Sequence, residues 1–247
     1  MAINWIETKI IEHKRWTEVL ASLKFKGDVL PYTAGQFTKV GLEIDGEMIS
    51  RPYSYVSSPN EDFLEIVYVM VPDGKLTPAL SGLNVGDKLF AMEKASGFFV
   101  MSEVPDGDDL WMLATGTGLG VFISLLKTNE PWDRFKNIVL VHGVRAADEL
   151  TYKDQIDEFS DKFKERFTYI PTITREKKDS CLNLRIPAGL KDNKFQEIAK
   201  LDITSKTQVM ICGNPDMIND TVSLLEKSGL ERNRRSKPGN ITLEKYW

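Results

Sequence analysis

The sequence predicts an antiparallel β-barrel followed by an α/β domain with a doubly wound parallel sheet. Short strand-like segments separated by tight turns fill residues 3 to about 100, whereas buried strands alternate with helical segments after a turn at 105–108. We therefore expect a first domain at residues 1–103 and a second at 104–247. The length of 247 residues and the hydrophobic content of 42% allow two domains, each with its own core.

Alternating hydrophobicity and turn residues define the elements of the first domain. Strands are expected at residues 18–26, 37–44, 48–56, 63–71 and 88–92. Asp45-Gly46 lies between two of these strands, where a type I′ hairpin turn needs residues that accept a positive φ. Thr77-Pro78 predicts a helix start, with Thr77 as the N-cap and Pro78 in the first helical position.

The second domain is predicted from strands and helices in regular alternation. Strands are expected at residues 110–114, 137–141, 167–173 and 207–211, and helices at 151–165, 195–201 and 216–227, with another helix after the glycines that follow residue 115. Asn214 and Pro215 are the expected N-cap and first residue of the last helix. Such alternation is typical of a parallel sheet.

Composition excludes several function classes. The net charge of −4 argues against nucleic acid or a membrane surface as the main partner. Two cysteines and two histidines are too few for a cysteine-ligated iron–sulfur cluster and argue against any metal site. The same cysteine count permits no disulfide framework and, with a start that lacks a signal-peptide pattern, predicts a cytoplasmic protein. No residue pattern reports the oligomeric state, and a monomer is the expectation.

Arg51-Pro52-Tyr53 is the most informative run of the first domain. Arg51 and Tyr53 share one face of a strand, and Pro52, which has no N–H, favours an edge of the barrel. A guanidinium can grip a pyrophosphate while the neighbouring phenol offers a flat stacking surface. The run fits an ordinary strand with aromatic packing equally well, so it does not decide the question alone.

A second phosphate site is predicted where Asp73-Gly74-Lys75 leads into the helix start. Free backbone N–H groups and the helix dipole favour an anion at such a place. One helix start and one arginine fork together suggest a ligand with a diphosphate. The first domain is therefore a candidate nucleotide-cofactor domain.

Thr115-Gly116-Thr117-Gly118 follows the first buried strand of the second domain and opens a helix, which is the usual phosphate seat of a parallel sheet. Its G-x-G-x-G spacing is a weaker match than the strict dinucleotide fingerprint. NAD selectivity usually needs an acidic residue after the second strand, and Arg145 stands there instead. Arg175 and Arg185 follow nearby. Three arginines could surround a 2′-phosphate, which favours NADP(H), although each alone could be a solvated charge.

Cys212-Gly213 ends the last predicted strand. Gly213 permits a close approach of the backbone to a ligand, and we expect Cys212 at the carboxyl edge of the sheet, pointing toward the first domain. A cysteine in such a place is more often a small buried hydrophobe. His142 is expected to be a structural histidine.

Five motifs occur in order along the chain: Arg51-x-Tyr53-Ser54, Gly74-Lys75-Leu76-Thr77, Gly116-Thr117-Gly118, Cys212-Gly213-Asn214-Pro215 and Glu244-Lys245-Tyr246-Trp247. Together they resemble the ferredoxin/flavodoxin–NADP⁺ reductase family, specifically its bacterial branch, over essentially the whole chain. The resemblance implies an FAD-binding barrel, an NADP-binding sheet and a C-terminal aromatic tail that returns to the flavin.

The resemblance also implies roles for single residues. Arg51 would hold the FAD pyrophosphate, Tyr53 would stack on the isoalloxazine, and Ser54 would hydrogen-bond near flavin N5. The remaining predicted FAD contacts are Pro52, Lys75, Leu76, Thr77, Tyr246 and Trp247. The predicted NADP contacts are Thr115, Gly116, Thr117, Gly118, Arg145, Arg175, Arg185, Cys212 and Gly213. The predicted catalytic residues are Ser54, Cys212, Glu244 and Tyr246.

The predicted function is an oxidoreductase that transfers a hydride between NADP(H) and FAD and single electrons between FAD and a ferredoxin or flavodoxin. A flavin can accept a hydride and release electrons one at a time, which connects a two-electron donor to a one-electron carrier. Basic clusters at residues 9–15 and 232–237 would dock an acidic carrier, and Tyr246 or Trp247 would gate the nicotinamide. The competing interpretations are a free-flavin/NADPH reductase and a non-catalytic flavin electron-transfer subunit of a larger complex.

Overall fold

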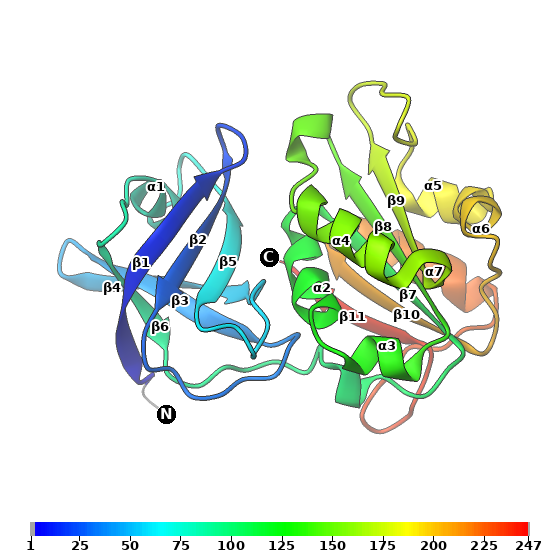
Figure 1. Cartoon of the computed structure of the whole chain (residues 1–247), viewed down its shortest axis with the longest axis horizontal. Helices are drawn as coiled ribbons and strands as arrows, with labels where there is room; N and C mark the ends of the chain where they lie inside the picture. Colours follow the sequence, from blue (N-terminus) through cyan, green and yellow to red (C-terminus); the bar gives the residue numbers. More distant parts are fainter. Residues whose placement is uncertain (1–2, 247) are drawn as a thin grey trace. The chain divides into compact units, whose positions relative to one another are not determined.

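A computed structural model describes residues 3–246 and divides the chain into two compact units, Met1–Val100 and Met101–Trp247. Each unit has a hydrophobic core of its own. The first is built on an antiparallel sheet and the second on a parallel sheet with helices (Figure 1). The predicted fold class is confirmed.

The first unit is a six-stranded antiparallel sheet with the order β4-β3-β6-β1-β2-β5. Its elements are β1 (Trp5–Arg15), β2 (Leu20–Lys26), β3 (Phe37–Ile44), β4 (Glu47–Ser54), β5 (Leu64–Val69), α1 (Leu76–Ser81) and β6 (Lys88–Met92). The sheet curls toward a barrel, because the N–H of Val56, just after one edge strand, donates to the Glu65 carbonyl of the other edge strand at 2.8 Å.

Local sequence explains two features of this sheet. Asp45 and Gly46 have φ values of 53° and 80°, which confirms the type I′ turn between β3 and β4. The longest strand, β1, has no clean alternation because the two adjacent apolar residues Ile10 and Ile11 fall at a register shift against β2. Ile10 is buried in the barrel core whereas Ile11 is exposed. The bulge thus interrupts the alternation of apolar and polar residues, and β1 was not predicted from the sequence.

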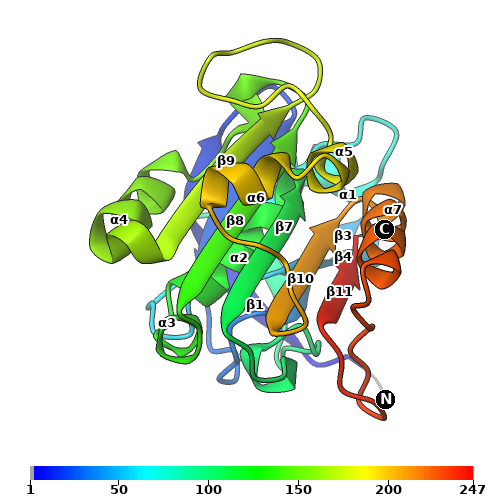
Figure 2. The same cartoon turned by 90° about the vertical axis from the view of Figure 1, so that its right-hand side faces the viewer.

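The second unit is a five-stranded parallel sheet with the order β11-β10-β7-β8-β9, and Figure 2 shows its strands side by side. Its strands are β7 (Asp109–Thr115), β8 (Asn137–Val144), β9 (Phe167–Ile173), β10 (Thr207–Gly213) and β11 (Ile241–Lys245). Its α-helices are α2 (Leu119–Leu126), α3 (Glu130–Arg134), α4 (Lys153–Phe163), α5 (Ile186–Lys191), α6 (Lys194–Ala199) and α7 (Pro215–Lys227). Its short 3₁₀ turns are η1 (Met101–Glu103), η2 (Gly116–Gly118), η3 (Ala147–Glu149) and η4 (Lys164–Arg166).

Helices cover both faces of this sheet. Alternate strand residues such as Leu113 and Ile211 pack in one cluster with residues of α5, α6 and α7. The other face carries α2, α3 and α4 (Figure 1). Both faces are therefore dry, and β7 and β10 are almost continuously buried, as is typical of parallel strands.

Several helix boundaries differ from the prediction. The helix expected at 151–165 spans Lys153–Phe163, because Tyr152 before it and Lys164 after it have positive φ values of 56° and 41° that cannot continue a helix. The helix expected at 195–201 spans Lys194–Ala199 and ends at Lys200, whose φ is 51°. The last helix begins as predicted, since the Asn214 side chain accepts hydrogen bonds from the N–H groups of Asp216 and Met217. Three short elements, α3, α5 and β11, were not predicted.

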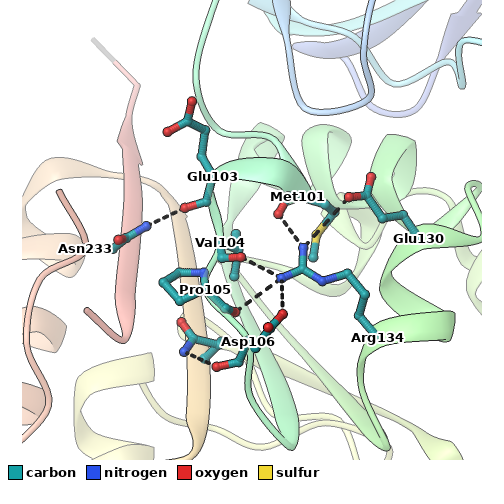
Figure 3. Close-up of polar contacts among 9 residues, drawn as sticks. Met101, Glu103, Val104, Pro105, Asp106, Glu130, Arg134 and Asn233 are labelled. Carbon is teal, nitrogen blue, oxygen red and sulfur yellow. Dashed lines mark hydrogen bonds and ion pairs between the residues drawn. The ribbon is translucent and has the colours of Figure 1, made fainter. Parts of the chain in front are cut away.

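Arg134 at the end of α3 fixes the segment that leads into β7 (Figure 3). Its guanidinium donates to the carbonyl oxygens of Met101, Val104 and Pro105 and to the Asp106 carboxylate. Asn233, on the loop before β11, donates to the Glu103 carbonyl at 2.6 Å. These bonds supply side-chain donors to carbonyl oxygens of η1 and of the irregular segment between η1 and β7.

Within residues 3–246, no helix has the length and apolar character needed to cross a membrane. The same residues contain no group of three or more side chains suited to hold a metal ion.

Candidate active site

The edge strand β4 presents Arg51 and Tyr53 on one side, as predicted. Arg51 is exposed, and its Nη1 donates to the Ser50 carbonyl at 2.7 Å. No carboxylate of the described residues forms an ion pair with it. Tyr53 packs against the barrel core, where burial raises its pKa to about 12, so its hydroxyl stays protonated near neutral pH. The edge position expected from Pro52 is confirmed, and Ser54 is buried at the strand end.

The prediction for the start of α1 was wrong. The N-cap is Lys75 and not Thr77, and no side chain caps this end. The Thr77 hydroxyl accepts a hydrogen bond from the Val71 N–H at 2.8 Å, so it closes the preceding turn and is not available for capping. Pro78 is tolerated as the third helical residue because an N–H in the first turn has no intrahelical acceptor.

The donors of this unit fit the diphosphate of FAD. The first-turn N–H groups of Leu76 and Thr77 lack intrahelical partners, and the guanidinium of Arg51 has donors to spare. Helix α1 contacts both β3 and β4, the strand that carries Arg51. The unit therefore has two anion-accepting groups of different origin on elements that contact each other.

In the second unit, the ends of β7 and β10 lie against each other. A Cβ on Gly118 would come within 2.6 Å of the Cys212 carbonyl, and one on Gly213, whose φ is +132°, within 2.2 Å of the Thr115 hydroxyl. The same hydroxyl accepts from the Asn214 N–H at 2.9 Å. Gly116, with φ +54°, has no atom within 4 Å of such a Cβ. Gly118 and Gly213 thus allow the ends of β7 and β10 to pack closely against each other. The space beside Gly116 is open, which fits a dinucleotide pyrophosphate.

Three exposed arginines follow the neighbouring strands β8 and β9. Arg145 comes directly after β8, and its carbonyl accepts from the N–H of Arg175 at 2.8 Å, which joins the two strand ends. Arg185 precedes α5, whose first residue, Ile186, lies against Gly143 of β8. No carboxylate of the described chain forms an ion pair with any of the three guanidinium groups. The predicted arginine group is brought to one end of the sheet, with its charge unpaired.

Cys212 is fully buried in β10 and is the direct register partner of Glu244 in β11. Burial raises the pKa of its thiol well above the usual value, the Glu244 charge adds to this, and a hydrogen bond with Tyr246 acts in the opposite sense. The N–H of Tyr246 donates to the Gly213 carbonyl at 3.1 Å. The structure therefore gathers Cys212, Glu244 and Tyr246, while the predicted FAD contact Trp247 lies outside the described residues.

His142 has the structural environment that the sequence predicted. It is fully buried in β8, and burial lowers its pKa to about 4. Its Nε2 lies 3.2 Å from the Gly116 carbonyl and its Nδ1 3.4 Å from the Tyr169 hydroxyl. These contacts join residues 26 and 27 positions apart, so no local motif could have revealed them.

The chain is similar to known proteins over its whole length. Family models described as oxidoreductase FAD-binding and NAD-binding domains match residues 7–97 and 112–223. The flavodoxin/ferredoxin–NADP reductase of Escherichia coli (strain K12) is 43% identical over 246 residues, with 99% of each chain covered. The chain belongs to the ferredoxin/flavodoxin–NADP reductase family. A more distant reductase of this family, the ferredoxin–NADP reductase of Azotobacter vinelandii, is 35% identical over 96% of this chain and 95% of its own.

The ferredoxin/flavodoxin–NADP reductase fold extends over the whole of this chain. The crystal structure of a ferredoxin NADP⁺ reductase from Neisseria gonorrhoeae with bound FAD and NADP matches all of both chains, with a TM-score of 0.94 and 32% identity. Membership of this reductase family fixes the cofactor domains as FAD-binding and NADP-binding.

Proposed function

We propose that this chain transfers a hydride between NADP(H) and a bound FAD, and single electrons between that FAD and a ferredoxin or flavodoxin. The observation that carries the proposal is a pair of candidate phosphate sites, one on each unit, whose arginines form no ion pair with a described carboxylate. The first is Arg51 with the start of α1, and the second is the Gly116 turn with its three arginines. The names of the full-length relatives, flavodoxin/ferredoxin–NADP reductases, support the same reaction.

On the first unit, Arg51 and the first-turn N–H groups at Leu76 and Thr77 hold the FAD diphosphate, with Lys75 beside them. Tyr53 offers its ring as a stacking surface for the isoalloxazine, and Ser54 ends the same strand. Pro52 keeps the outer edge of β4 free of a competing N–H donor. When bound, FAD supplies the conversion between two-electron and one-electron transfer.

On the second unit, the backbone from Thr115 to Gly118 receives the pyrophosphate of NADP(H). Arg145, Arg175 and Arg185 pair with the 2′-phosphate, which NADH lacks, and so set the preference for NADPH. Gly213 lets the end of β10 pack closely against Thr115, and the nicotinamide end of the ligand would lie beside Cys212. Glu244 and Tyr246 adjoin the same cysteine. Tyr246 or Trp247 would gate the nicotinamide at this end.

The test uses the purified full-length chain. We expect it to carry FAD without added cofactor and to reduce a one-electron acceptor with NADPH. Arg51→Ala should lose FAD, whereas Arg145→Ala should keep FAD and raise the KM for NADPH but not for NADH. A colourless protein that takes up no FAD on reconstitution contradicts the proposal.

The same experiment separates a free-flavin reductase, the second candidate function. Such an enzyme releases its flavin as product, so gel filtration would remove the colour. The unpaired Arg51 and uncapped α1 favour a retained diphosphate cofactor. We also propose that the chain acts in the cytoplasm, which its two free cysteines support. A monomer remains the expectation for its oligomeric state.

A further inference from the structure

The buried histidine of β8 directly contacts the turn from Thr115 to Gly118, where the NADP(H) pyrophosphate is proposed to bind. His142 has no exposed surface, and its Nε2 lies 3.2 Å from the carbonyl oxygen of Gly116, the first glycine of the turn. Its other ring nitrogen, Nδ1, lies 3.4 Å from the hydroxyl of Tyr169 on β9. The three groups form a line from β9 through β8 to the end of β7.

Chemistry fixes the direction of every hydrogen bond in this line. A carbonyl oxygen can only accept, so the His142 Nε2 must carry the proton that it shares with Gly116. Burial keeps the imidazole neutral, with a pKa of about 4, so Nδ1 has no proton and must accept. The Tyr169 hydroxyl, whose pKa burial raises, is then the donor. Tyr169 thus selects the histidine tautomer that can bond the turn.

Holding the Gly116 carbonyl has a consequence on the far side of the same peptide group. In a trans peptide the C=O of one residue and the N–H of the next point in opposite directions. A Gly116 carbonyl held toward His142 therefore turns the N–H of Thr117 away from it. This N–H lies in the first turn of η2, where it has no intrahelical acceptor. Gly116 has a φ of +54°, which L side chains rarely adopt, and open space lies beside it.

We propose that His142, with Tyr169 behind it, is a positioning residue for dinucleotide binding that holds the Gly116–Thr117 peptide with its N–H directed at the pyrophosphate. The proposal rests on the function proposed above, because it assumes that NADP(H) binds at this turn. It differs from simple core packing in one respect. The effect of the pair passes through one peptide group, so it acts on the pyrophosphate and not on the 2′-phosphate at Arg145 and Arg175.

Ligand binding to matched variants separates a positioning role of His142 from simple core packing. His142→Leu removes the donor, His142→Gln restores an N–H near the position of Nε2, and Tyr169→Phe removes only the group that selects the tautomer. We expect His142→Leu to weaken NADP⁺ binding roughly five- to tenfold, as for a lost hydrogen bond, and His142→Gln to recover most of it. Adenosine 2′-phosphate, which carries the 2′-phosphate without the pyrophosphate, should bind all variants equally well.

A spectroscopic measurement tests the tautomer itself. The chain has only two histidines, so ¹⁵N NMR of histidine-labelled protein resolves His142 once His13→Asn assigns the other signal. We expect the neutral Nε2–H form in the wild type and a tautomer mixture in Tyr169→Phe, which keeps its fold and FAD. Because this variant does not disturb the core volume, it remains informative if His142→Leu fails to fold.

Two results overturn the inference: a wild-type Nδ1–H tautomer, or equal weakening of NADP⁺ and adenosine 2′-phosphate binding, which indicates general loosening of the unit. A wild-type protein that binds neither adenosine 2′-phosphate nor NADP⁺ refutes the proposed function instead. Failure of this inference and failure of the proposed function are therefore distinguishable.

Discussion

At the scale of single residues, burial gives the two cysteines different chemistry. Cys212 is fully buried and its thiol pKa lies well above the ordinary value, whereas Cys181 is only half-buried on the loop after β9. A thiolate is the species that reacts with alkylating reagents. The cysteine nearest the predicted nicotinamide site is therefore the less reactive one.

We expect iodoacetamide to modify Cys181 at least roughly tenfold faster than Cys212 in the folded protein near neutral pH. Peptide mass spectrometry after timed quenching measures both rates in one sample. Unfolding in urea should make the rates similar, which serves as the control. Equal rates in the folded state would show that Cys212 is accessible and that its thiol is not suppressed.

His142 predicts a pH dependence of stability. Its pKa is about 4 in the fold against an ordinary 6.5, so below pH 6.5 the unfolded chain binds a proton that the folded chain does not. The free energy of unfolding therefore falls as the pH drops from 6.5 toward 4, by about 2 kcal/mol at pH 5. His142→Gln lacks this contribution. Urea denaturation at pH 7 and pH 5 should show a smaller loss of unfolding free energy in the variant than in the wild type, and hydrogen exchange of the β7–β9 peptides should show the same difference locally. Equal losses in the two proteins contradict the role given to His142.

At the scale of elements, Arg134 of α3 binds the short turn η1 and the irregular segment that follows it. The carbonyl oxygens that it binds belong to Met101, Val104 and Pro105, and two of these three residues are buried. Buried acceptors that lose their donor keep the full cost of desolvation. One side chain of α3 thus binds three carbonyl oxygens of the segment that leads into β7.

Arg134→Met keeps the aliphatic part of the side chain and removes every donor. We expect it to lower the free energy of unfolding by about 2–4 kcal/mol, because hydrogen bonds to charged groups are worth more than neutral ones. Lys136→Met is the matched control, since its ion pair with Asp108 is exposed and should contribute little to stability. Chemical denaturation of the three proteins measures the difference, and similar stabilities of the two variants would contradict the clamp.

Elements also show which parts of the fold a sequence can predict. Patterns within a few residues succeeded: the Asp45-Gly46 turn and the Asn214 cap follow from backbone preferences of those residues. The prediction for the start of α1 failed because the N–H of Val71, six positions earlier, donates to the Thr77 hydroxyl that capping would need. Strand β11 was missed because its burial comes from β10, far away in sequence.

The candidate site follows the same rule. The ordered motifs predicted Arg51 and the glycine turn, and the arginines after the predicted strands of the second domain predicted the arginine group, since these residue types suit local geometry and charge. The line from Tyr169 through His142 to Gly116 could not be predicted, because it exists only when β7, β8 and β9 lie in register.

At the scale of the whole molecule, charge is unevenly paired across an acidic chain. The net charge is −4, yet residues 232–237 form a basic cluster. Within the described chain, Arg232 pairs with Glu226, Arg235 with Glu103 and Lys237 with Glu231. No such pair involves Arg234, which is exposed. Arg234 can therefore meet a carboxylate of another protein without first breaking an internal ion pair.

This pairing predicts how the basic cluster acts on an acidic ferredoxin or flavodoxin. We expect Arg234→Gln to lower kcat/KM for the carrier several-fold at low salt, and Arg232→Gln, which removes the same charge from a side chain already engaged with Glu226, to lower it less. Both effects should fade as ionic strength rises, because salt screens attraction between exposed charges. NADPH-dependent reduction of a neutral quinone, which needs no protein docking, should stay unchanged in both variants. If carrier turnover is indifferent to salt and to Arg234→Gln, electrostatic attraction by this cluster does not bring the carrier to the reductase.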